Sequence, residues 1–375
     1  MKFLHLADLH LGKRVNGFDM LEDQRFILEQ ILTLCEKHGV EAVVIAGDIY
    51  DTPVPPAAAC TLLDWFLTQL AARRLPVLAV SGNHDSAERL DFASSLLAEQ
   101  NVHIAGRFTG CPKQVVLNDR HGPIEFTLLP FVRAATVRHY LPDADITDYD
   151  SAVGAALAVC EPAAPRRVLV AHQMVVSGVC PPQLSGSETA PLTIGTVDSV
   201  DAAHFAKFSY TALGHIHRAQ RVGSDTVRYA GAPLCYHLDE CGMEKSATLV
   251  RLGRRGVDDI ETLPLHPRRA MRHIVGPLAK LVEHPDDTSD YIWATLTDPT
   301  PQPDAMAVLR AAYPNAMRLD YRPQGADLQH ADTAQSVRGK PFASLFEDFF
   351  TQMNGRPLTV EEARAVKALR EEASK

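Results

Sequence analysis

The sequence contains no long apolar run, and none of its seven cysteines forms a Cys-x-x-Cys pair. A membrane-spanning helix needs about 20 mostly apolar residues, so we expect no such segment. Scattered cysteines argue against a zinc ribbon and give no disulfide framework. The first ten residues lack the continuous apolar core of a signal peptide. We therefore expect a cytoplasmic protein with reduced thiols.

The sequence also lacks an excess of positive charge. Its 46 acidic and 37 basic residues give a formal net charge of −9. The overall field of such a chain does not attract nucleic acid, although a local basic patch or bound metal ions can still do so. Hydrophobic residues make up 46% of the 375 positions, which indicates a globular chain large enough for two or three domains.

Apolar strand-like runs alternate with amphipathic helix-like runs over the first 100 residues. The pattern predicts strands at 2–7, 41–47 and 75–82, and helices at 21–39, 56–74 and 87–100. Such alternation with buried strands is typical of an α/β architecture. Short strand candidates follow at 102–106, 114–118 and 124–130, and they indicate a second, more antiparallel sheet.

The organisation of the chain changes near residue 268. Strand-like runs at 271–276, 291–298 and 316–323, with a helix at 304–314, predict a small separate α+β unit. The polar stretch 323–340 is typical of a linker, and the pattern becomes helical again from Pro341. We therefore predict a first domain at 1–267, an α+β domain at 268–322, a linker at 323–340 and C-terminal helices at 341–375.

Polar side chains follow five of the predicted buried strands, at the point where each strand ends. They are Asp8 and His10, then Asp48, then Asn83, His84 and Asp85, then His172, and finally His215 and His217. Because ligands of α/β sheets bind at the carboxyl ends of strands, we expect these side chains to gather at one edge. Each motif alone is weak, since Gly-Asp after a strand is more often a turn and a lone histidine is more often structural. Their ordered combination is a strong signal.

The chemistry of this set fits a pair of divalent metal ions. Carboxylate, imidazole and amide ligands without thiolate suit manganese, iron or zinc, and the share of oxygen ligands favours manganese. Two such ions can clamp the attacking and leaving oxygens of an in-line phosphoryl displacement. Asp48, which follows a glycine at the end of the central strand, is the natural bridge between them.

The ordered motifs Asp-x-His, Gly-Asp-x-x-Asp, Gly-Asn-His-Asp, a single histidine and Gly-His-x-His resemble those of the calcineurin-like metallophosphoesterases. Within that superfamily the sequence is similar to the SbcD type of nuclease subunit, a bacterial relative of the double-strand-break repair nucleases. MKFLHLADLHLGK, AGDIYDTPVPP, SGNHDSAERL, ALGHIHRAQ and YAGAPLCYHLDECGMEKSATLV carry the resemblance, which covers nearly the whole chain. It implies a two-sheet sandwich flanked by helices, with a small α+β capping domain.

The resemblance also implies how the residues divide between two metals. Asp8, His10, Asp48 and His217 would hold one ion, and Asp48, Asn83, His172 and His215 the other. His84 would protonate or steer the leaving oxygen, a task that suits imidazole near pH 7. Asp85 would assist catalysis by orienting His84 or the loop. Asp51 replaces a histidine found in some members of the superfamily, so its role stays open beside that of a helix-capping or turn residue.

Three functions compete for this site. The resemblance favours a DNA nuclease that degrades double-stranded ends and cuts single strands and hairpins, together with the SMC-like ATPase SbcC, as a homodimer within a nucleoid-associated heterotetramer. A metallophosphatase or phosphodiesterase acting on a small molecule or protein would use the same metals, but it has no need of residues 268–375. A non-catalytic scaffold would be expected to have lost ligands.

The parts of the chain that would bind DNA and the partner are less sharply marked. Lys13, Arg14 and the basic stretches 251–255 and 268–272 are candidate phosphate contacts, although each is more often a solvated surface. In the tail, apolar residues recur at helical spacing, and Thr359 and Glu362 form a capping-box pattern. By resemblance, we expect these helices to bind SbcC, with packing on the chain's own body as the alternative.

Overall fold

A computed structural model describes residues 1–178, 180–186 and 199–322, together with 346–347, 349–351, 356–359, 362–364 and 366 near the C-terminus. The chain divides into two compact units, Met1–Arg272 and His273–Lys375. The predicted linker at 323–340 lies outside the described residues. The three predicted boundaries between the four segments stay predictions.

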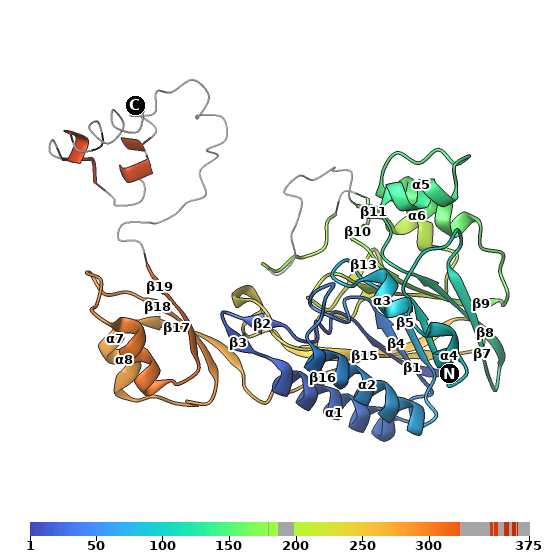
Figure 1. Cartoon of the computed structure of the whole chain (residues 1–375), viewed down its shortest axis with the longest axis horizontal. Helices are drawn as coiled ribbons and strands as arrows, with labels where there is room; N and C mark the ends of the chain where they lie inside the picture. Colours follow the sequence, from blue (N-terminus) through green and yellow to red (C-terminus); the bar gives the residue numbers. More distant parts are fainter. Residues whose placement is uncertain are drawn as a thin grey trace. The chain divides into compact units, whose positions relative to one another are not determined.

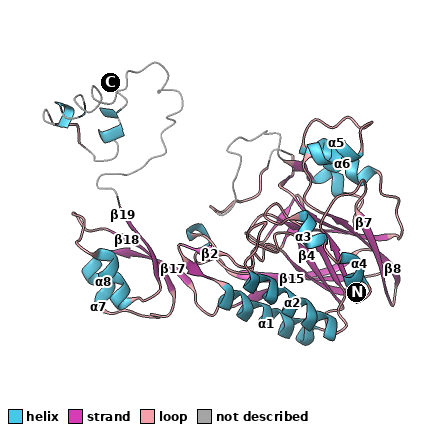
Figure 2. Cartoon of the chain, viewed as in Figure 1, coloured by secondary structure: helices cyan, strands magenta, loops and turns pink. Residues whose placement is uncertain are grey.

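The first unit contains two six-stranded sheets that face each other (Figures 1 and 2). The first sheet has the order β16 (Val257–Leu265), β15 (Lys245–Leu252), β1 (Lys2–Leu6), β4 (Ala42–Ala46), β5 (Val77–Val80) and β6 (Val102–Ala105). The second has the order β13 (Gln220–Val222), β14 (Ser224–Tyr229), β12 (Tyr210–Gly214), β9 (Arg166–His172), β8 (Gly122–Leu129) and β7 (Lys113–Asp119).

Helices and short strands complete this unit. The helices are α1 (Leu21–His38), α2 (Ala57–Ala72), α3 (Ala87–Asp91), α4 (Ser94–Ala98), α5 (Ala134–Tyr140) and α6 (Tyr149–Ala158), with single 3₁₀ turns at Ala202–Phe205 and Leu238–Glu240. The short strands are β2 (Arg14–Val15), β3 (Phe18–Asp19), β10 (Val175–Val176) and β11 (Val200–Asp201). The two-sheet sandwich flanked by helices that we predicted is confirmed.

Side-chain alternation along β9 shows how the layers are held together. Val168 and Val170 point into the core between the two sheets, whereas Leu169 and Ala171 point into the core beneath α6. Phe3 of β1 lies at the centre of the intersheet core, with its ring centroid 5.7 Å from that of Phe126. Both faces of β9 are therefore buried, which explains why its sequence is a continuous apolar run.

Three sequence predictions need correction. Residues 102–106 do not start the second sheet, because β6 pairs parallel with β5 in the first. The second sheet is less antiparallel than predicted, since β8, β9, β12 and β14 run parallel and only its edge pairs are antiparallel. The helix predicted at 87–100 is broken into α3 and α4 by Ala93, whose φ of 58° is incompatible with a continuous right-handed helix.

The second unit contains a three-stranded sheet of β17 (Met271–Gly276, whose first residues precede the division), β18 (Tyr291–Leu296) and β19 (Ala316–Tyr321). Helices α7 (Leu278–Glu283) and α8 (Ala305–Ala312) pack on one face of it, where Ile292, Ala294 and Leu309 form the core.

Among the described residues of the tail, the predicted capping box is present. The Thr359 amide donates to Glu362 at 2.8 Å, and the Glu362 amide donates to the Thr359 hydroxyl at 3.3 Å. No helix within the described ranges is long and apolar enough to cross a membrane.

Candidate metal centre

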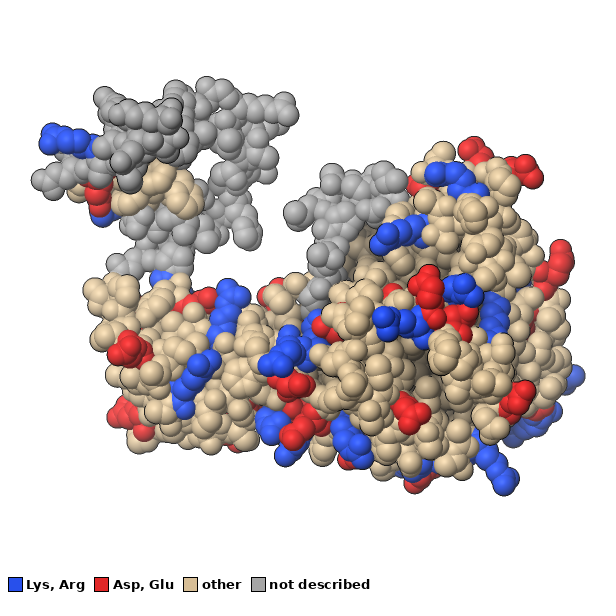
Figure 3. Space-filling view, in the orientation of Figure 1, with Lys and Arg blue, Asp and Glu red and all other residues tan. Residues whose placement is uncertain are grey.

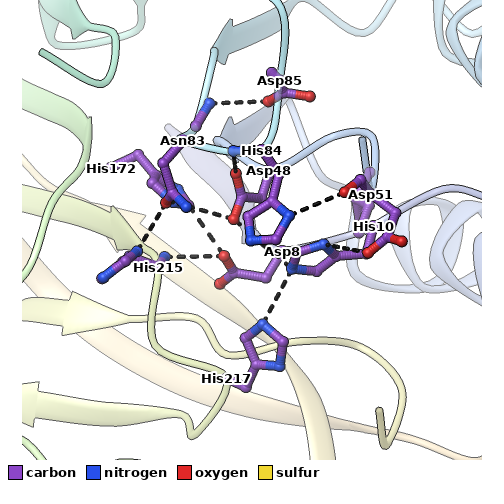
Figure 4. Close-up of polar contacts among 12 residues, drawn as sticks. Asp8, His10, Asp48, Asp51, Asn83, His84, Asp85, His172, His215 and His217 are labelled. Carbon is purple, nitrogen blue, oxygen red and sulfur yellow. Dashed lines mark hydrogen bonds and ion pairs between the residues drawn. The ribbon is translucent and has the colours of Figure 1, made fainter. Parts of the chain in front are cut away.

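The polar residues that end β1, β4, β5, β9 and β12 gather at one place, as predicted (Figure 4). The three inner pairs of these strands run parallel, so their carboxyl ends lie at the same edge of each sheet. The two sheets face each other and bring both edges together. The site contains every metal ligand that the sequence predicted: Asp8, His10, Asp48, Asn83, His172, His215 and His217.

The backbone of this site is held in an unusual conformation. Asp8, His10, Asp48 and His215 have φ angles of 54°, 46°, 47° and 102°, in a region that non-glycine residues rarely adopt. Hydrogen bonds between the loops keep them there, since the amides of Asp8 and His10 donate to the carbonyls of Gly47 and Asp48 at 3.1 and 3.0 Å. Strain of this kind persists where the surrounding structure imposes it, and it is concentrated at functional sites.

Three glycines allow the strand ends to approach closely. A Cβ atom at Gly47 would overlap the His172 ring, one at Gly82 would overlap the Asp48 carboxylate, and one at Gly214 would overlap the Ala46 carbonyl oxygen. The φ angle of Gly82 is not in the left-handed region, so its missing Cβ matters here because it leaves room for Asp48.

One group of ligand atoms surrounds the end of β1. The Nε2 atoms of His10 and His217 lie 3.1 Å apart, and Oδ2 of Asp48 lies 3.7 Å from the former. Asp8 is fully buried, and its Oδ2 atom has no hydrogen-bond partner among the described residues. Two imidazole nitrogens thus face each other beside a buried carboxylate oxygen that has no hydrogen-bond partner. This arrangement suits a cation that all three atoms bind.

A second group of ligand atoms lies around Asn83. Its Oδ1 atom is 3.0 Å from Nε2 of His172 and 2.9 Å from Nδ1 of His215. Oδ2 of Asp48 lies 3.3 Å from Nε2 of His172, so the same carboxylate oxygen borders both groups. This position is the one that a bridging carboxylate requires, and the ligand types suit divalent metals.

The titration of His10 and His215 agrees with metal binding, whereas His172 must first release a proton. Burial lowers the pKa of His10 to about 4 and that of His215 to about 3, so both imidazoles keep a lone pair at neutral pH. For His172, burial alone would lower the pKa, but the Asp48 carboxylate outweighs burial and raises it to about 9. Burial likewise opposes ionisation of Asp48, yet His172 and His10 hold its pKa below its usual range. Asp48 therefore favours a positive partner.

Further carboxylates and a carbonyl orient three of the histidines. Asp51 lies 3.3 Å from Nδ1 of His10, Glu240 lies 3.1 Å from Nδ1 of His217, and the Ala46 carbonyl lies 2.9 Å from Nδ1 of His172. Such contacts fix the tautomer of a metal-binding histidine and raise its basicity.

Of these two supporting carboxylates, the sequence left the role of Asp51 open and did not point to Glu240. Burial opposes ionisation of Asp51, but hydrogen bonds from His10 and Lys13 outweigh it and lower its pKa to about 2. Asp51 therefore contacts the charged Lys13 beside the site, and it forms a potential metal-binding group with His10 and His84. The sequence did not indicate Glu240, because one acidic residue in a turn gives no local signal.

His84 and Asp85 have distinct surroundings. Nδ1 of the half-buried His84 lies 2.9 Å from the Asp51 carbonyl, which can only accept, so the neutral ring carries its proton on Nδ1. Asp85 accepts hydrogen bonds from the amides of Ile49, Tyr50 and Gly82 at 2.8–3.1 Å. Of the two roles proposed for Asp85, these contacts favour orienting the loop over orienting His84. A catalytic role for either residue stays a prediction.

Several of the basic residues proposed as DNA contacts have acidic partners. Lys13 pairs with Asp51 at 2.7 Å, Arg268 with Glu22 at 2.8 Å, and Arg251 with Asp259 at 3.7 Å. On the face drawn in Figure 3, blue and red side chains are interspersed rather than gathered into one basic patch. Arg254 and Arg255 are exposed, however, so part of the positive charge of the stretch 251–255 stays available to a phosphate backbone.

Comparison with known families identifies both parts of the chain. The model of the calcineurin-like phosphoesterases matches residues 1–175. A second model, described as the type 5 capsule protein repressor C-terminal domain and named SbcD_C, matches residues 267–354.

The solved structures that match this chain have low sequence identity to it. GAP50, the anchor in the inner membrane complex of Plasmodium, is 12% identical, with a TM-score of 0.43, and the match covers 86% of this chain and 98% of that one. TT1561 of Thermus thermophilus is 15% identical, with a TM-score of 0.40 and coverages of 71% and 99%. A dimetal phosphatase from Danio rerio is 14% identical, with a TM-score of 0.37 and the same coverages.

Proposed function

This chain belongs to the calcineurin-like metallophosphoesterases and carries an SbcD-type C-terminal domain, and on that premise we propose that it is a DNA nuclease. It would act as an exonuclease on double-stranded ends and as an endonuclease on single strands and hairpins. The observation that carries the proposal is the combination of a complete predicted ligand set at the strand ends with the domain matched at residues 267–354.

We assign the ligand residues to two divalent ions. Asp8, His10, Asp48 and His217 would hold one ion, and Asp48, Asn83, His172 and His215 the other, with manganese favoured by the oxygen ligands. When bound, such ions polarise the phosphoryl oxygens and lower the pKa of an attacking water. The buried Asp8 Oδ2 and the shared position of Asp48 support this division.

The chain's own residues would position the substrate and move the proton. The Asp51 carbonyl holds the His84 proton at Nδ1 and leaves Nε2 to carry a second proton. A doubly protonated His84 would transfer the Nε2 proton to the oxygen of the departing strand and return to the neutral form. Asp85 would keep the loops after β4 and β5 in register, so that His84 and Asp48 stay together.

The proposal implies two binding partners, the ATPase and a second copy of this chain. We propose that the tail at 341–375 binds the SMC-like ATPase SbcC, and that the catalytic unit forms a homodimer. The described part of the tail contains apolar side chains, with Phe349 57% exposed. In the first unit, Phe92 and Leu96 are 80% and 69% exposed, which provides an apolar surface suited to a second copy. In a cell, such an assembly would act at the nucleoid within the cytoplasm.

A nuclease assay tests the proposed function. Blunt duplex, hairpin and single-stranded DNA would be incubated with the full chain and manganese, magnesium or a chelator, with and without the ATPase. We expect metal-dependent cleavage that Asp48→Asn abolishes together with metal binding, whereas the exposed Asp239→Asn leaves both intact. Hydrolysis of bis-p-nitrophenyl phosphate without cleavage of any DNA would instead favour a small-molecule or protein phosphoesterase.

A further inference from the structure

A polar cavity of about 250 Å³ lies beside the metal centre, in the first unit. His217 forms part of its wall, together with Arg218, Lys245 and Ser246. Small residues form most of the remaining wall: Ala219, Ala230, Gly231, Ala232 and Gly242. Because His217 belongs to both the cavity and the metal centre, the cavity adjoins a residue of the proposed ligand set.

Arg218 is the available cation of this cavity. Lys245 is already neutralised, since its Nζ atom lies 2.6 Å from Oε2 of Glu240 and 3.3 Å from the His217 carbonyl. Arg218 is half-buried, and its side chain has no hydrogen bond or ion pair with any residue that the structure describes. Glu244, also in the wall, is exposed and makes no ion pair with Arg218. Solvent therefore screens that carboxylate more strongly than it screens the guanidinium.

The wall of the cavity is tightly built on the side of the metal centre. Gly231 has a φ of 79°, and a Cβ atom there would lie 2.7 Å from the Ala219 amide nitrogen and 2.9 Å from the His217 carbonyl oxygen. The Ala232 amide also donates to that carbonyl at 3.1 Å. The backbone that carries Arg218 is therefore fixed relative to His217, which suits a positioning role.

We propose that this cavity binds a phosphate of the DNA strand that flanks the scissile one, with Arg218 as its ligand. The inference rests on the proposed nuclease function and names a substrate contact that a compact phosphatase would not need. A guanidinium matches the geometry of a phosphodiester and makes charge-assisted hydrogen bonds to it. Lys13 and Arg268 are paired with acids, whereas Arg218 has its charge available at a cavity that His217 also lines.

As a consequence, Arg218 should affect the hydrolysis only of substrates that have a second phosphate next to the scissile one. A small phosphodiester such as bis-p-nitrophenyl phosphate has no flanking phosphate, so its hydrolysis does not depend on Arg218. An oligonucleotide gains binding energy from the flanking contact and uses it to hold the scissile phosphate in place. A hydrogen-bonded charge pair of this kind contributes about 10–100-fold to kcat/KM.

The test combines a protein substitution with a matched change in the substrate. Full-length wild type and Arg218→Gln would be compared on an oligonucleotide, on the same oligonucleotide with one neutral methylphosphonate flanking the scissile linkage, and on bis-p-nitrophenyl phosphate. We expect Arg218→Gln and the methylphosphonate each to reduce kcat/KM about 10–100-fold, and the two together to reduce it no further. Hydrolysis of bis-p-nitrophenyl phosphate should be unchanged, and Arg218→Lys should recover part of the loss.

Arg221→Gln is the matched control, because Arg221 lies three residues away and is exposed in an ion pair with Asp225. It should behave as wild type on all three substrates. Additive losses from Arg218→Gln and the methylphosphonate, or an equal loss on bis-p-nitrophenyl phosphate, would overturn the Arg218 assignment alone. Failure of the wild type to cleave any oligonucleotide while it hydrolyses the small diester would overturn the proposed nuclease function, and this site with it.

Discussion

Oε1 of Glu240 lies 3.1 Å from Nδ1 of His217, on the side of the ring opposite the nitrogen that faces His10. The other oxygen of Glu240 lies 2.6 Å from Nζ of Lys245, and the carboxylate is completely buried. A 3₁₀ turn between β14 and β15 thus fixes the orientation of a histidine that ends β12. Such contacts are a general means by which proteins strengthen a metal ligand without touching the metal.

Glu240→Gln should weaken metal binding although Glu240 is not assigned as a ligand. We expect a loss of about 10–100-fold in metal affinity, because an amide orients the His217 ring less strongly than a carboxylate. Isothermal titration with manganese would measure the loss. Asp239→Asn, one position away and exposed, is the control. Unchanged affinity in Glu240→Gln, with an unchanged melting temperature, would show that the contact with His217 has no effect on the metal.

His84→Gln should separate catalysis from metal binding. Glutamine can keep a hydrogen bond near the Asp51 carbonyl but cannot deliver a proton, so we expect a loss of about 10²–10⁴-fold in rate with both metals retained. Metal content by mass spectrometry and steady-state cleavage of DNA would be measured on the same preparation. Loss of metal would make His84 a ligand, and an unchanged rate would make it structural.

The buried pair of Asp119 and Arg166 should make stability depend on pH. Their closest atoms are 2.6 Å apart, and Arg166 holds the pKa of Asp119 well below its usual range. The stabilisation is therefore present above the pKa of Asp119 in the unfolded chain, about 3.9, and is lost as the pH falls below it. Asp119→Asn should lower the free energy of unfolding by about 3–5 kcal/mol at pH 7.

Urea unfolding at pH 7 and at pH 3 would check this dependence. The difference between wild type and Asp119→Asn should be smaller at the lower pH, because the wild-type carboxylate is partly protonated in the unfolded state. Asp225→Asn removes an exposed pair with Arg221 and should cost less than about 1 kcal/mol. A difference that does not change with pH would mean that packing, and not charge, accounts for the effect of Asp119.

Leu96→Glu should disrupt the proposed homodimer. Leu96 is 69% exposed next to the even more exposed Phe92, and a charge placed in a buried apolar interface costs several kcal/mol. Light scattering coupled to size exclusion should show a dimer for the wild type and a monomer for the variant. Val159→Glu, at a 44% exposed position after α6, should remain dimeric. A monomeric wild type would show that the proposed dimer does not form. A dimeric Leu96→Glu variant would show that the interface lies elsewhere.

Truncation after Lys340 should separate the partner from the metal centre. We expect the shortened chain to hydrolyse bis-p-nitrophenyl phosphate normally, because every proposed metal ligand lies between Asp8 and His217. It should no longer co-purify with the ATPase, since the residues proposed to bind it are missing. Retention of the partner at full affinity, or unfolding of the truncated chain, would show that the tail belongs to the body of the protein.

The ligand set could be predicted from the sequence because its signal is local. A buried strand followed by a carboxylate, amide or imidazole is visible in a few consecutive residues, and Asp8, Asp48, Asn83, His172 and His215 each have such a context. The parallel arrangement of the strands then requires these ends to lie at the same edge. The two-sheet fold was predicted from the family resemblance that these ordered motifs carry, together with the strand-like runs at 102–130.

Only the tertiary structure decided which groups support that site and which cation lines the neighbouring cavity. Glu240 reaches His217 because a turn folds back over the strand end, and Arg218 lies in the cavity wall next to His217. The break at Ala93 and the pairing of β6 with β5 depend on long-range packing that outweighs local propensity. Contacts between residues far apart in the sequence leave no periodic pattern, so the ligands were predictable from sequence whereas their supporting contacts were not.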